Sequence, residues 1–219
     1  MDPGQPLTRP VQLLAGPGSD AARSPLLRSG LVACACSVAW AALAGVALVT
    51  AGTVTGSVAL LAFGLDSVID GSASAVLVWR FRLELRRASE PVRAERTAAR
   101  VVAAAMLAAA VYVAAQAARS LIIRAHPGQS VTGLVLLAVS LPVLPVLGYI
   151  KLRLAVQLGS RALRGDGVLS VAGAALAAAA LAGLALDRSM GWWEAGPAAA
   201  SLIALFLLRE GWHTMRHPT

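Results

Sequence analysis

The chain of 219 residues is 58% hydrophobic with a mean hydropathy of +0.71, and only 14% of its residues are charged. Soluble domains carry about a quarter of charged residues, so this composition excludes an ordinary soluble protein and indicates a membrane protein. The net charge of +8 would suggest nucleic-acid binding in a soluble chain. Here the arginines lie between apolar runs and report membrane topology, so we expect no nucleic-acid partner.

Six apolar runs follow an N-terminal stretch that is rich in Pro, Gly, Ser and Arg. Residues 1–29 predict a disordered cytoplasmic tail, residues 30–208 an all-α transmembrane domain, and residues 209–219 a short cytoplasmic tail. The six expected spans, each close to the length that a bilayer requires, are Leu31–Val49, Ser57–Trp79, Val101–Ile123, Val131–Ile150, Val168–Leu186 and Trp192–Leu208.

Positive charge predicts the orientation, because Lys and Arg accumulate in short cytoplasmic loops. With both termini in the cytoplasm, all but three of the 19 Lys and Arg residues lie on the inner side, the exceptions being Arg119, Arg124 and Arg188. We therefore predict a multi-pass protein of the cell (inner) membrane. The sequence holds no motif of a hydrolytic triad or a phosphate-binding glycine loop, so we expect neither an enzyme nor a resident cofactor.

Two acids, Asp66 and Asp70, lie near the middle of the second expected span. An Asp at the centre of a spanning helix costs about 2.5–3.5 kcal/mol on insertion scales, so the pair needs a cation, protons or a water-filled cavity. Residues four apart share one helix face, and both carboxylates could bind one cation. We interpret them as metal ligands. The alternative is a structural polar core in which protons or an arginine neutralise the acids.

A short internal echo links the second span to the fifth. The segment GSVAL at residues 56–60 recurs as GSRAL at residues 159–163. When the two are aligned, Asp66 lies opposite Leu169 and Asp70 opposite Gly173. The second copy therefore lacks the acids.

These features resemble the cation diffusion facilitators, six-span metal transporters with a D-x-x-x-D pair in the second span and an H-x-x-x-D or D-x-x-x-D pair in the fifth. The segment LDSVID at residues 65–70 resembles the second-span motif, and SRALRGD at residues 160–166 resembles the family's fifth-span pattern. The chain is most similar to a divergent branch of small bacterial cation transporters, in which Leu-Trp-Arg-Phe-Arg follows the second span as VWRFR does at residues 78–82. The last expected span ends at Leu208, so we expect no counterpart of the family's cytoplasmic C-terminal domain.

In that family an Asp precedes the fifth-span metal-binding pair, so the resemblance implies Asp166 as a third metal ligand beside Asp66 and Asp70. An N-cap role for Asp166 at the start of its helix is the alternative. The resemblance further implies transport of a divalent cation, with zinc as the first candidate, by metal/proton antiport and alternating access. Metal and protons would compete for the same carboxylate oxygens. Oxygen ligands select zinc weakly, so manganese or another divalent ion also stays open.

The missing ligands at Leu169 and Gly173 favour a second interpretation, a non-transporting metal-binding or regulatory membrane protein. The expected partners are the metal ion, protons, the lipid bilayer and a second copy in a homodimer, which close packing of small residues would allow. Glu84, Glu90 and Glu95 alternate with arginines between the second and third spans. We expect them to form solvated ion pairs that contribute little.

Overall fold

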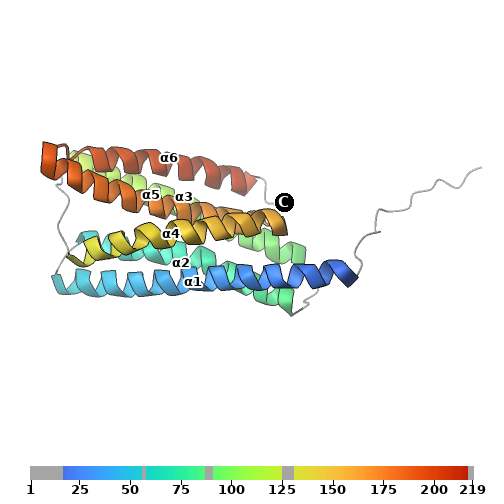
Figure 1. The fold of residues 1–219 in the computed structure, drawn as a ribbon. Coiled ribbons are helices and arrows are strands. Elements are labelled where there is room, and N and C mark those ends of the chain that lie inside the picture. Colours follow the sequence, from blue (N-terminus) through green and yellow to red (C-terminus); the bar gives the residue numbers. More distant parts are fainter. Residues whose placement is uncertain (1–16, 56–57, 87–90, 125–130, 217–219) are drawn as a thin grey trace, which may run out of the picture.

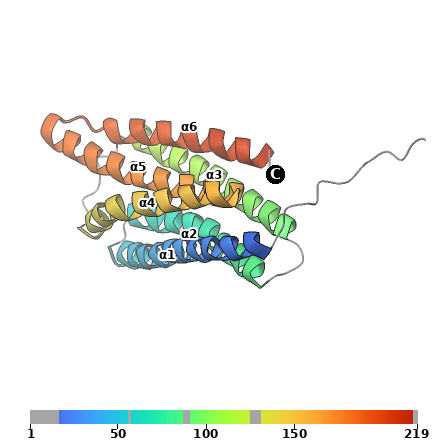
Figure 2. The same cartoon turned by 45° about the vertical axis from the view of Figure 1, so that its right-hand side comes forward.

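The computed structural model describes residues 17–55, 58–86, 91–124 and 131–216. Over these residues the chain forms helices and no strands. The helices lie side by side in one elongated bundle (Figures 1 and 2), which confirms the all-α prediction. Their bounds are α1 Pro17–Thr55, α2 Val58–Leu85, α3 Pro91–Ile122, α4 Val131–Leu158, α5 Arg161–Met190 and α6 Ala195–Arg216.

Four of these helices are long and apolar enough to cross a membrane by themselves. The apolar stretches are Arg23–Val54 in α1, Val92–Ile122 in α3, Val131–Leu158 in α4 and Arg161–Met190 in α5. α2, which carries the two acids, and α6 lie alongside them in the bundle (Figure 1). α1 begins and α6 ends at the same end of the bundle (Figure 1). We call this the arginine-rich end, and the positive-inside rule predicts that it faces the cytoplasm.

Helix ends follow local sequence signals at the two ends of α5. The Ser160 hydroxyl accepts a hydrogen bond from the Leu163 amide and caps the first turn. Gly191 has a φ of 69°, a left-handed conformation that ends the helix at little cost for glycine. α1 begins at Pro17, so residues 17–29, which the sequence placed in a disordered tail, are helical. Residues 1–16 lie outside the described part of the chain.

The two halves of the bundle repeat each other with opposite orientation. Thr55 and Leu158, which end α1 and α4, are as far apart in sequence as Val58 and Arg161, which begin α2 and α5. Consecutive helices are antiparallel, so α1 and α4 run in opposite directions (Figure 1). The echo between residues 56–60 and 159–163 is therefore part of an inverted repeat that relates α1–α3 to α4–α6.

Glycines at equivalent positions bring the helices of each half close together. Gly64 of α2 faces Val49 of α1, where an added Cβ would lie 2.7 Å from Val49 Cγ2. Gly167 occupies the equivalent position in α5, where a Cβ would lie 3.0 Å from the Leu152 side chain of α4. Small residues allow this close approach in lipid, which offers no hydrophobic drive for helix association.

The apolar core lies in the half of the bundle toward the arginine-rich end. It draws on the late residues of α2, α4 and α6 and on the early residues of α3 and α5, which meet at that end. Leu77, Phe81, Met106, Leu163 and Leu207 are among its fully buried side chains. This half is therefore closed by packing.

Candidate metal site

Asp66, Asp70 and Ser74 share one face of α2, because they follow one another at intervals of four residues. Asp66 and Asp70 are both partly exposed. Among the side chains that the structure describes, neither acid takes part in an ion pair. This face therefore offers two adjacent, partly exposed carboxylates to a cation. We call Asp66 and Asp70 the open pair.

A second acid, Asp166, lies deeper in the bundle and is paired with a lysine. Lys151 Nζ of α4 is 2.7 Å from Asp166 Oδ2 of α5, and both side chains are fully buried. The Ser74 hydroxyl donates to Asp166 Oδ1 at 2.8 Å. Cys34 Sγ of α1 lies 3.8 Å from Asp166 Oδ2. We call Lys151 and Asp166 the closed pair, since charge and hydrogen bonds satisfy the carboxylate on every side.

Two serine hydroxyls complete the surroundings of the Lys151 ammonium. Lys151 Nζ donates to Ser74 Oγ at 3.1 Å and to Ser170 Oγ at 3.0 Å. The Ser170 hydroxyl in turn donates to the Asp166 carbonyl oxygen at 3.2 Å. Three oxygen atoms from α2 and α5 thus surround a cation carried by α4.

The structure decides one of the two interpretations of Asp166. Ser160 is the N-cap of α5, and Asp166 lies within the helix, so the N-cap interpretation is wrong. The ligand interpretation stays a prediction, with Lys151 occupying the carboxylate in this conformation. Sequence reasoning treated Lys151 only as a cytoplasmic charge. The available signal was that Lys151 is the only lysine of a chain that uses arginine at every other basic position.

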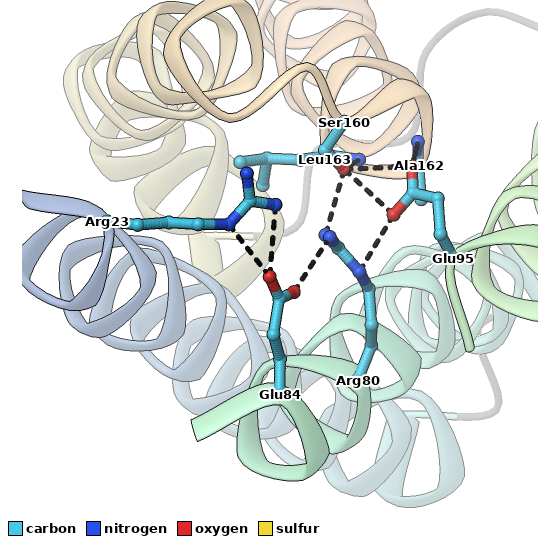
Figure 3. A network of polar contacts seen from close by, with 7 residues as sticks. All are labelled: Arg23, Arg80, Glu84, Glu95, Ser160, Ala162 and Leu163. Atoms are coloured by element: carbon cyan, nitrogen blue, oxygen red, sulfur yellow. Dashed lines mark hydrogen bonds and ion pairs between the residues drawn. The ribbon is translucent and has the colours of Figure 1, made fainter. Parts of the chain in front are cut away.

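A third group of charges closes the arginine-rich end (Figure 3). Arg80 of α2 is 4% exposed. Its Nη2 donates to Glu84 Oε2 at 3.1 Å, and its Nη1 donates to Ser160 Oγ at 3.0 Å. Its Nε lies 2.7 Å from Glu95 Oε2 of α3 in an ion pair that is not aligned as a hydrogen bond. One buried guanidinium therefore links α2, α3 and the start of α5.

Glu95 and Glu84 extend this network to the neighbouring helices. Glu95 Oε1 accepts hydrogen bonds from the Ser160 hydroxyl and the Ala162 amide, each at 3.1 Å. Glu84 Oε1 accepts from Arg23 Nε of α1 at 3.0 Å. We call Arg23, Arg80, Glu84, Glu95 and Ser160 the inner charge network.

The prediction of solvated ion pairs is wrong for Glu84 and Glu95. Their side chains are only 13% and 20% exposed and pair with a buried arginine, because the helices converge at this end. Glu90 lies outside the described residues. Sequence reasoning counted Arg80, like Lys151, among the cytoplasmic charges and did not predict that it is buried.

The predicted ligands are not gathered into one metal site in this conformation. Within the described ranges, no group of three or more His, Cys, Asp or Glu side chains is placed to hold a metal ion. Asp70 nevertheless lies one turn before Ser74 on α2, and the Ser74 hydroxyl contacts both Lys151 and Asp166. At the equivalent positions of α5, Leu169 is buried and Gly173 packs against Leu144. The open pair and the closed pair are thus neighbours.

Comparison with known families adds to this picture. Residues 35–217 match the family model described as the cation efflux transmembrane domain. The matched segment takes in most of α1 and all of α2–α6, and so includes the open pair, the closed pair and Arg80. The chain has no significant match among curated proteins.

Proposed function

This chain belongs to the cation efflux family of metal-cation transporters, and we propose that it carries a divalent cation, with zinc as the first candidate, through a site built on Asp66 and Asp70. The observation that carries the proposal is the open pair itself. Two carboxylates lie one turn apart on α2, partly exposed, in a helix of a multi-pass membrane protein. Acids inside a membrane domain are costly and mark ion pathways.

The charge of the open pair suits a divalent cation, because two carboxylates balance two positive charges. Asp166 is the third candidate ligand, one that would become available only when it leaves Lys151. Oxygen ligands also accept manganese and other divalent ions. Zinc is therefore the first cation to test and not the only one.

Proton coupling would follow from the same carboxylates. A bound cation requires deprotonated ligands, so metal binding releases protons and acid promotes metal release. We propose metal/proton antiport across the inner membrane on this basis. A homodimer is part of the same proposal, since Ala and Gly are abundant in the spans and small residues allow close helix contacts.

Alternating access is supported by the inverted repeat. Transporters built from inverted repeats bind cargo near the middle of the membrane and rock one half against the other. In this conformation the apolar core and the inner charge network both lie toward the arginine-rich end. The arrangement fits a state in which the cytoplasmic side is closed.

The main experiment is zinc flux into proteoliposomes under an imposed pH gradient. We expect wild-type protein to accumulate zinc and the Asp66→Ala/Asp70→Ala variant to fall to the level of protein-free liposomes, because both ligands of the open pair are gone. The matched control is Asp187→Ala, which removes an acid at the far end of α5 and is expected to keep the flux. Unchanged flux in the double variant would refute the proposed site.

Acid should weaken metal binding. We expect the zinc affinity of the purified protein to fall as the pH is lowered, since protons compete for the carboxylates of the open pair. Zinc titrations at a series of pH values measure this directly. An affinity that is independent of pH would contradict a carboxylate site.

A second candidate function, metal binding without transport, is favoured by one observation. The second half of the repeat has Leu169 and Gly173 where the first half has its acids. This alternative predicts zinc binding that depends on the open pair and no zinc accumulation under any pH gradient.

A further inference from the structure

We propose that Lys151 is a tethered cation that competes with the cargo for Asp166, so that it sets the affinity of the transport site. This inference rests on the proposed function and assigns a role to a residue outside the open pair. The observation behind it is that the Lys151 ammonium occupies a buried cradle of oxygen atoms next to the open pair.

The cradle has the chemistry of a cation site. The ammonium meets Asp166 Oδ2 at 2.7 Å, Ser170 Oγ at 3.0 Å and Ser74 Oγ at 3.1 Å. A carboxylate and hydroxyl oxygens are also ligands for hard divalent cations. Lys151 therefore holds oxygens that a metal ion could use.

The cradle continues the face that carries the open pair. Ser74 lies one helical turn beyond Asp70 on α2 and contacts both members of the closed pair. A cation that leaves Asp66 and Asp70 toward the arginine-rich end meets the closed pair next.

The residue type suits a competitor. A lysine carries a compact charge on a flexible four-carbon stem, whereas an arginine presents a planar fork that favours fixed pairs. Arg80 shows the second behaviour in the inner charge network, where it bridges two glutamates. Lys151 is the single lysine of the chain. Its ammonium contacts Asp166, the third candidate ligand.

The number of free carboxylates at the site depends on whether Lys151 is paired with Asp166. With Lys151 on Asp166, the cargo meets two free carboxylates; without Lys151, it would meet three. A third carboxylate would bind a divalent cation more tightly and slow its release. Lys151 thus keeps the affinity in the range that a carrier needs, because a carrier must release its cargo on every cycle.

The test is a zinc titration of the purified full-length protein in detergent. We expect Lys151→Met to bind zinc more tightly than wild type by about tenfold or more, the scale on which outer-shell partners alter metal affinity. We expect Lys151→Met/Asp166→Asn to lose that gain, since the freed carboxylate is then absent. Arg153→Met, which removes an exposed positive charge from the same helix, should bind like wild type.

Cobalt(II) absorption separates ligand exchange from a general effect of charge. If Asp166 joins the metal in Lys151→Met, the visible bands of bound cobalt should differ from those of wild type and should return to the wild-type form in Lys151→Met/Asp166→Asn. A purely electrostatic effect would leave the bands unchanged and would overturn the proposal. Since the double variant keeps the cluster neutral, it also serves as the folded reference if Lys151→Met alone proves unstable.

Two further outcomes distinguish a failure of this inference from a failure of the proposed function. Zinc binding of equal affinity in wild type and Lys151→Met would overturn the role of Lys151 and leave the open pair standing. An absence of zinc, manganese and cobalt binding in every variant would overturn the proposed function, and this inference with it.

Discussion

The open pair and the closed pair place acids of the same kind in opposite environments. Asp66 and Asp70 lie on α2, partly exposed and without an ion-pair partner among the described residues. Asp166 is fully buried on α5 and meets Lys151, Ser74 and Cys34. Buried charges are retained when they are paired and hydrogen-bonded, whereas unpaired acids in a membrane domain indicate function. The comparison separates an acid whose charge is paired in this conformation from two acids that are available to a ligand.

The inverted repeat allows the acids of α2 to be compared with the residues at the equivalent positions of α5. α2 and α5 are equivalent helices of the two halves, yet only α2 carries acids at the positions opposite Leu169 and Gly173. α5 instead contributes Asp166 and Ser170 closer to the arginine-rich end, where α4 supplies Lys151. One half thus provides the open pair, and the other half provides Lys151 and Asp166 of the closed pair beside it.

The largest expected effect on the free energy of unfolding comes from breaking the closed pair. Asp166→Asn should lower the free energy of unfolding by about 3–5 kcal/mol, because it leaves the buried Lys151 ammonium without a counter-charge. Asp70→Asn should change it by less than about 1 kcal/mol, since that acid is partly exposed and in no ion pair with another described residue. Denaturant unfolding in mixed micelles measures both. Equal destabilisation by the two variants would contradict the distinction between the pairs.

A smaller effect is expected at the inner charge network. Arg80→Gln should cost about 2–3 kcal/mol, because it leaves two partly buried glutamates without their shared partner. Arg23→Ala should cost no more than about 1 kcal/mol, because the Arg23 side chain is 48% exposed and its pair with Glu84 is accessible to water. The same unfolding experiment compares them. A larger loss for Arg23→Ala than for Arg80→Gln would show that burial does not govern this network.

The smallest effect concerns equivalent glycines of the two halves. A Cβ at Gly148 would lie 2.7 Å from Val171 Cγ2 and 3.2 Å from the Gly167 carbonyl oxygen, so Gly148→Ala should cost about 1–3 kcal/mol through overpacking. A Cβ at Gly45, the equivalent position in α1, would meet Ser67 Cβ at an ordinary 3.5 Å. Gly45→Ala should therefore be neutral or stabilise by up to about 1 kcal/mol. The shift in the thermal unfolding midpoint of each variant measures the difference, and equal shifts would contradict a closer approach of α4 to α5 than of α1 to α2 at these glycines.

Local patterns determined much of this protein. Apolar runs of spanning length predicted the six helices, and the clustering of arginine predicted which ends meet. The shared face of Asp66 and Asp70 was also predictable, because two residues four apart must lie together on any helix. The echo between residues 56–60 and 159–163 showed that the second half lacks the acids of the first. Each of these inferences depends on neighbours in sequence.

Only the tertiary structure decided which charges are buried and paired. Ser74 and Asp166 are 92 residues apart, and Arg80 and Ser160 are 80 residues apart. Nothing in the local sequence distinguishes Arg80 from the exposed Arg82, or Asp166 as an ion-pair partner from a helix cap. The environment of a charge is set by the helices that pack around it, and those helices come from distant parts of the chain. The sequence therefore determined the helices and the open pair, and the packing of four helices determined the closed pair.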